Sequence, residues 1–283
     1  FLDKDKYLKK VNNMKMLTEI DNKVNKNLEL TKEELIFLYQ IYSNIEGFGY
    51  EEDPRIEEIQ DKRDIKKDFA LIFNCKEENV GTKISDLKKN NVMWFYGDLI
   101  YYGEMLTDKF KKLQIIVGDA YFPNLVSAEG FENLQYICGK AIFPKLKSAK
   151  GFRNLKNISK IAYFDSLVSA EGFDSLENLN YEVDFPKLMS AEGFESLQSI
   201  GGSAIFTNLI SAQGFDNLKN IRGKAYFPKL SSALGFYSLQ NIEKEAKFPG
   251  LVSAEGFESL EKVNGEDAIK FKEEINSRGS KTL

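Results

Sequence analysis

Residues 190–215, "SAEGFESLQSIGGSAIFTNLISAQGF", contain a motif that occurs at their start and again at their end. The Ser-Ala pair at Ser190 recurs at Ser211, and a Gly-Phe pair follows each after one intervening residue. The same serine recurs every 21 residues, at Ser127, Ser148, Ser169, Ser190, Ser211, Ser232 and Ser253. A fixed period of this length is the sequence signature of a stacked-repeat architecture.

The period also extends upstream of the first Ser-Ala pair. Gly97, Phe110, Leu113 and Ile116 precede Gly118, Phe131, Leu134 and Ile137 by 21 residues each. A degenerate first coil therefore begins near Gly97. We predict about eight coils over residues 97–264.

One unit has the pattern "GxAxFPxLxSAxGFxxLxxIx", in which short apolar pieces alternate with Gly and Pro. Such pieces suit short strands that end at corners better than they suit helices. A unit this short cannot bury its own apolar face, but stacked copies place Phe on Phe and Leu on Leu about 4.8 Å apart. The pattern predicts a parallel β-solenoid whose core ladders start at Phe122, Phe131 and Leu134.

The two ends differ from the repeat. Residues 1–96 lack the 21-residue period and carry helical patterns, including a capping box from Thr31 to Glu34. A solenoid exposes apolar rungs at each end, so terminal units of different composition are required as caps. We predict a helical N-terminal cap domain over 1–96 that closes the first coil, the solenoid over 97–264, and a C-terminal cap or tail over 265–283. The fold class is α+β.

Composition restricts the classes of function. The chain has 283 residues, a net charge of −4, no histidine and two cysteines, Cys75 and Cys138. This charge does not favour nucleic acid, and no apolar run reaches the ~20 residues that a membrane span needs. A zinc site of Cys and His ligands and a disulfide framework are not expected, and no cofactor is predicted. Cys138 stands where other coils have polar residues, which predicts a place near the surface.

Catalysis is not indicated by the residue types in the repeat. The serines at Ser127 and its equivalents have no histidine to activate them, and the carboxylates recur from coil to coil without a distinctive pair. We therefore expect no enzyme. The protein is expected to be a monomer, and the absence of a visible signal peptide favours the cytoplasm; secretion is the alternative if a leader preceded Phe1.

The segments "GFESLQSIGGSAIF" and "GFDNLKNIRGKAYF" resemble bacterial leucine-rich repeats, especially the receptor L-domain type. The resemblance covers about residues 97–264, with Ala where that pattern prefers Leu and a uniform coil of 21 residues. It implies a repeat protein that binds other proteins or ligands on a sheet face.

The clearest functional signal is the middle residue of Ala-x-Phe. If Ala and Phe point inward, the pleat turns the residue between them outward. The predicted partner-binding residues are Ile100, Tyr121, Ile142, Tyr163, Ile205 and Tyr226, in a row that Asp184 and Lys247 interrupt. The alternatives are that these side chains only stabilise the sheet or lie under the cap.

A second candidate is a patch for an acidic partner on the coil of residues 139–159, formed by Lys147, Lys150 and Arg153. That coil carries no acidic residue. Stacking also places Lys150 between Glu129 and Glu171, and Arg153 between Glu132 and Asp174, so pairing between coils could neutralise the patch.

Together these features predict a non-enzymatic, protein-binding scaffold of leucine-rich-repeat character whose target is another protein. Two other functions remain open at this point. The first is a secreted or phage-borne effector or inhibitor that blocks a host protein. The second is an enzyme whose activity resides in residues 1–96.

Overall fold

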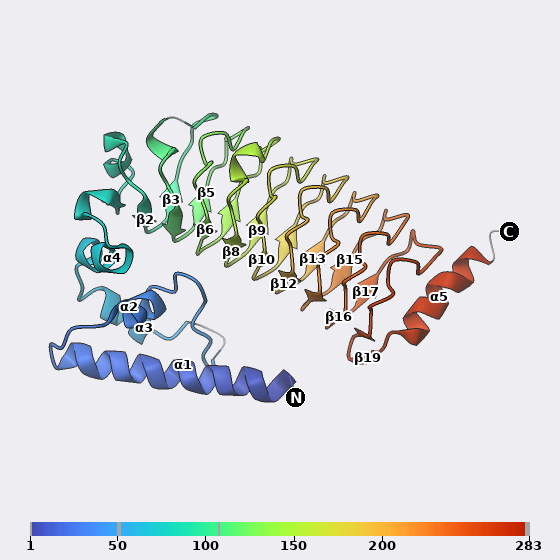
Figure 1. The fold of residues 1–283 in the computed structure, drawn as a ribbon, viewed down its shortest axis with the longest axis horizontal. Helices are drawn as coiled ribbons and strands as arrows, with labels where there is room; N and C mark the ends of the chain where they lie inside the picture. Colours follow the sequence, from blue (N-terminus) through green and yellow to red (C-terminus); the bar gives the residue numbers. More distant parts are fainter. Residues whose placement is uncertain (1, 50–51, 107, 281–283) are drawn as a thin grey trace.

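The computed structural model describes residues 2–49, 52–106 and 108–280. Figure 1 shows a helical N-terminal part, a long row of stacked coils and a C-terminal helix at the far end. The helices of the N-terminal part are α1 (Leu2–Asn25), α2 (Lys32–Leu38), α3 (Arg55–Gln60) and α4 (Ile65–Phe73). The capping box that opens α2 is confirmed: Thr31 Oγ1 accepts from the Glu34 N–H, and the Glu34 carboxylate accepts from the Thr31 N–H.

Within the described residues the strands form two sheets that follow the coils. Sheet A contains β1 (Val80–Gly81), β2 (Trp94–Tyr96), β4 (Ile115–Val117), β6 (Tyr136–Ile137), β8 (Asn157–Ile158), β10 (Asn178–Leu179), β12 (Ser199–Ile200), β14 (Asn220–Ile221), β16 (Asn241–Ile242), β18 (Lys262–Val263) and β19 (Glu266–Asp267). Sheet B contains β3 (Leu99–Ile100), β5 (Ala120–Tyr121), β7 (Ala141–Ile142), β9 (Ala162–Tyr163), β11 (Val183–Asp184), β13 (Ala204–Ile205), β15 (Ala225–Tyr226) and β17 (Ala246–Lys247).

Successive coils pair in parallel with a register of one repeat, as in Ala120↔Ala141 on sheet B and Ile116↔Ile137 on sheet A. The Ser-Ala corner forms a third row of contacts through isolated parallel bridges such as Ser190↔Ser211. The last pair, β18 with β19, is antiparallel and ends sheet A. The predicted fold class, an α+β parallel β-solenoid of about eight coils of 21 residues, is confirmed.

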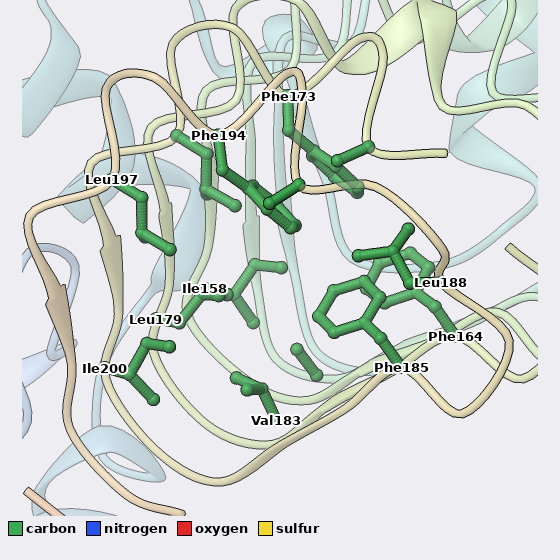
Figure 2. Packing of buried hydrophobic residues seen from close by; sticks show 14 of the residues in the cluster. Ile158, Phe164, Phe173, Leu179, Val183, Phe185, Leu188, Phe194, Leu197 and Ile200 are labelled. Atoms are coloured by element: carbon green, nitrogen blue, oxygen red, sulfur yellow. The ribbon is translucent and has the colours of Figure 1, made fainter. Parts of the chain in front are cut away.

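The core consists of stacked aromatic and aliphatic columns. In the column that starts at Phe122, neighbouring rings are nearly parallel and their centroids lie 5.1–5.5 Å apart. Rings of the Phe131 column meet these edge-on, as Phe173 does with Phe164 at 5.5 Å. Figure 2 shows Phe164 and Phe185 stacked on one side of the coil and Leu179 and Ile200 on the other. The predicted Phe and Leu ladders are therefore the buried core.

Within residues 1–96, the segment after α4 contacts the end of the first coil, and the helices α1 to α4 pack on the outward side of sheet A. Their buried residues form a second cluster together with outward residues of sheet A, among them Trp94, Ile115 and Val117. The end of the first coil is closed by the connecting segment, whose Leu87 and Val92 join the solenoid core. The reason is that sheet A of the first coils is apolar on its outward side, and that side must be covered.

The far end of the stack is covered by α5 (Ile269–Gly279). Phe271 packs against the last two core rings, Phe248 and Phe257, at 6.0 and 5.9 Å. Ile275 is buried in the same cluster, and Arg278 Nη1 donates to the Phe248 carbonyl at 2.8 Å. In the described part of the chain, no helix combines the length and apolar character that crossing a membrane requires.

Candidate protein-binding surface

The six residues predicted to bind a partner lie in one row on the outward side of sheet B. Strand pairing sets Ile100 against Tyr121, Tyr121 against Ile142, and Ile142 against Tyr163. The row continues through Asp184 to Ile205 and Tyr226. We call Ile100, Tyr121, Ile142, Tyr163, Ile205 and Tyr226 the Tyr/Ile column.

The side chains of the Tyr/Ile column face outward because the residues on either side of each pack into the core. These neighbours are Leu99 and Tyr101 at Ile100, and Ala and Phe at the other five members. Ala141 and Phe143, for example, are fully buried, whereas Ile142 between them is half-buried. Ile100 and Tyr226 are 46% and 39% exposed, and the other four members are half-buried. The helical part packs on sheet A, and its buried cluster contains no residue of sheet B. The structure thus brings the predicted residues together on an uncovered face.

A carboxylate interrupts the Tyr/Ile column in its middle. Burial, together with the neighbouring charges of Asp165 and Glu182, raises the pKa of Asp184. A hydrogen bond to Asp165 and its charge raise the pKa of Tyr163 beside it. The centre of this face is therefore acidic as well as aromatic.

A second outward apolar row lies on the neighbouring face, and the sequence analysis missed it. It consists of the residue that precedes Ser-Ala and of the position 21 residues before Val126 in the first coil. Its apolar members are Met105, Val126, Val168, Met189, Ile210 and Val252. All of them are exposed. We call these six residues the Val/Met column; Lys147 and Ser231 interrupt it. These apolar residues do recur at 21-residue spacing. The position is hard to recognise because it is a single outward residue between an inward Leu and the serine.

Carboxylates line one side of the Val/Met column. They occupy positions two or five residues after five of the seven serines: Glu129, Glu132, Glu171, Asp174, Glu192, Glu195, Asp216, Glu255 and Glu258. We call this set the acidic ridge. Part of it is structural, because Glu195 accepts a hydrogen bond from the Gly193 N–H at 2.9 Å and Glu258 does the same for Gly256.

The three residues of the predicted basic patch are exposed on the coil where the acidic ridge is interrupted. Lys150 pairs with Glu171 at 3.2 Å, which is the pairing between coils that stacking suggested. Within the described ranges, no carboxylate lies within 4.0 Å of the charged nitrogens of Lys147 or Arg153. The patch is therefore neutralised only at Lys150.

Cys138 is buried, which makes the expectation of a surface position wrong. It lies on the outward side of sheet A, but the loop after α2 covers it, and its Sγ donates to the Ile41 carbonyl at 3.0 Å. The same loop donates from Asn44 Nδ2 to the Ser159 carbonyl and sets Tyr42 edge-on to Tyr136. Burial raises the pKa of the Cys138 thiol to about 12.

This contact predicts the reactivity of the thiol. In a Cys75→Ser variant, Cys138 is expected to react with a disulfide reagent at pH 8 at least ~100-fold more slowly than in the urea-unfolded chain, because the raised pKa leaves little thiolate. Absorbance of the released thiolate measures both rates. Equal rates would show that the helical part does not cover sheet A.

The helical part contains one buried charged group among the described residues, Asp68. Its carboxylate accepts two hydrogen bonds from Arg63, at 2.6 and 2.7 Å, and one from the Tyr39 hydroxyl at 2.7 Å. Burial and the hydrogen bond to Asp68 raise the pKa of Tyr39. A carboxylate satisfied in this way links α2 to α4 and is a structural feature.

The described residues contain no group of three or more Cys, Asp or Glu side chains placed to hold a metal ion. The surface defines a capped, parallel β-solenoid repeat protein with two outward apolar columns. No protein-family model, curated protein or solved structure matches the chain.

Proposed function

We propose that this chain is a non-enzymatic protein-binding scaffold of leucine-rich-repeat character that holds its partner on the outward face of sheet B. The observation that carries the proposal is the Tyr/Ile column, an aromatic and aliphatic row that only Asp184 interrupts, held on a rigid ladder and left uncovered by both caps. Clustered aromatic side chains on a rigid surface are where binding energy between proteins concentrates.

The leucine-rich-repeat assignment is supported by the arrangement of each coil. The Gly-Phe pair forms a corner, and the Leu and Ile that follow at the spacing of the G-F-x-x-L-x-x-I pattern are buried, as Leu197 and Ile200 are after Phe194. This Ile lies in sheet A, as in Ile200↔Ile221, and Leu179 and Val263 take its place in two coils. The corner, the buried Leu and Ile and the sheet position are the features in which the chain resembles leucine-rich repeats.

The proposal predicts that replacing Tyr121, Tyr163 and Tyr226 with serine will weaken partner binding by about 2 kcal/mol or more, roughly 30-fold, with the fold retained. Affinity capture from the native cell with the wild-type chain, followed by mass spectrometry, identifies the partner. Titration calorimetry then compares the two chains. Tyr237→Ser is the matched control, because Tyr237 is an exposed tyrosine outside the column.

Unchanged affinity in a folded triple variant would remove the Tyr/Ile column as the binding site. The next surface to test would then be Lys147, Lys150 and Arg153. If the triple variant unfolds while the control stays folded, the tyrosines serve the stability of the sheet instead.

A further inference from the structure

The Val/Met column is most continuous at Val168, Met189 and Ile210, which belong to three successive coils. These side chains are 49%, 51% and 47% exposed, more than the half-buried members of the Tyr/Ile column. No residue of the helical cluster or of the C-terminal helix covers them among the described residues. Three apolar side chains of this size, stacked and exposed, form a surface that suits a partner.

On its Gly-Phe side this segment is bordered by carboxylates, whereas Lys187 lies at the corner on its other side. Glu171, Asp174, Glu192, Glu195 and Asp216 of the acidic ridge lie on the same coils. Lys150 neutralises Glu171, but the described part of the chain places no Lys or Arg within ion-pair distance of Glu192 or Glu195. A partner for this surface should carry basic residues alongside its apolar ones.

The backbone of the segment already has its hydrogen bonds. The Met189 N–H donates to the Val168 carbonyl at 3.1 Å, and the Ile210 N–H donates to the Met189 carbonyl at 3.1 Å. An extended peptide therefore finds no free row of N–H and C=O groups there to extend the sheet. Only side chains remain for a partner to contact.

The spacing of the coils fits a helix. Adjacent parallel strands lie about 4.8 Å apart, and the core rings of adjacent coils over this segment lie 5.1–5.5 Å apart. The pitch of an α-helix is about 5.4 Å. A helix that runs along the solenoid would thus place one turn over each coil, with side chains at i, i+3/i+4 and i+7 against successive members of the column.

From these observations we propose that Val168, Met189 and Ile210, with the acidic ridge beside them, bind a basic amphipathic α-helix of a partner protein. Its apolar stripe packs on the three side chains, and its Lys or Arg residues face Glu192 and Glu195. This site lies on a different face from the Tyr/Ile column, around the corner formed by residues such as Pro186 and Lys187. An anionic membrane is not a suitable occupant, because the ridge repels it.

The test uses the full chain and a fluorescent 18-residue peptide with Leu at i, i+3, i+4 and i+7 spacing and Lys at the other positions. A second peptide has the same composition with the Leu positions scrambled, and a third has Glu in place of Lys. Fluorescence anisotropy is expected to show binding of the first, binding at least ~10-fold weaker of the second, and none of the third. Affinity for the first should fall as salt is raised.

Variants then locate the site. Met189→Ser combined with Ile210→Ser, and separately Glu192→Lys, are each expected to weaken binding of the first peptide at least ~10-fold. Val252→Ser is the matched control: it is an exposed member of the same column that Ser231 separates from the segment, and its affinity should stay within about twofold of the wild type. Because Glu192 is a surface residue, its variant keeps the test valid if the double variant unfolds.

Three results would overturn the proposal. Equal binding of the scrambled peptide would show charge attraction without an apolar site. Loss of binding in the Tyr121, Tyr163 and Tyr226 variant, with Met189→Ser and Ile210→Ser unaffected, would place the peptide on the Tyr/Ile column. Binding of the chain to vesicles containing phosphatidylserine would show that the apolar segment meets lipid instead.

Discussion

Phe143→Ala is expected to lower the free energy of unfolding by about 3–5 kcal/mol. The Phe143 ring is fully buried and stacks between Phe122 at 5.1 Å and Phe164 at 5.4 Å, with Phe152 edge-on at 5.4 Å. Its removal leaves a cavity between rigid neighbours, so the lost contacts are not replaced. Urea unfolding followed by circular dichroism measures the change.

The control for Phe143→Ala is Tyr226→Ser, an aromatic loss on the outward side of the same sheet. Because Tyr226 is exposed, this change should cost no more than about 1 kcal/mol. If both variants lose a similar free energy of unfolding, the inward Phe row and the outward Tyr/Ile column contribute equally to stability. That result would contradict the assignment of the first to the core and the second to the surface.

Gly193→Ala is the second change with a large expected effect, a loss of about 3 kcal/mol or more. Gly193 has a φ of +109°, and an added Cβ would lie 2.1 Å from the carbonyl oxygen of Ala170 in the preceding coil. Backbone cannot move aside there without opening the stack. The same unfolding experiment measures the loss.

Gly97→Ala separates the two causes of that loss. Gly97 also has a positive φ, +98°, but nothing lies within 4 Å of an added Cβ. Only conformational strain remains, about 1–2 kcal/mol. If Gly97→Ala proves as costly as Gly193→Ala, the close approach of coils at the glycine corner contributes nothing.

The solenoid could be predicted from the sequence because its determinants repeat. The Phe and Leu positions, and the Ile position in most coils, are equivalent from coil to coil. The 21-residue register alone therefore identifies the core residues. Side chains alternate between inward and outward along Ala-x-Phe, so the middle residue was predicted to face outward. The strand pairing shows that Tyr121, Tyr163 and Tyr226 lie in one row.

The position of the helical part could not be predicted, because it depends on contacts that occur once. Trp94 lies outside the region where the period was recognised, although it is an outward residue of β2 and stacks on Phe73 of α4 at 4.7 Å. Cys138 was compared with Ser159, Asn180 and Arg222, the residues at its position in other coils. That comparison ignores the loop that covers only the first coils, where Asn44 reaches Ser159.

The interface between coils is nearly the same wherever it occurs. Phe185 stacks on Phe164 with a 4° tilt and on Phe206 with a 5° tilt, at 5.1 and 5.5 Å. A duplication or loss of 21 codons within the array would therefore create an interface between coils like those already present, and the core would be unchanged. Recombination can thus lengthen or shorten both outward columns by one coil at a time, which is about 5 Å. The outward residues of an added coil can then change without affecting the core.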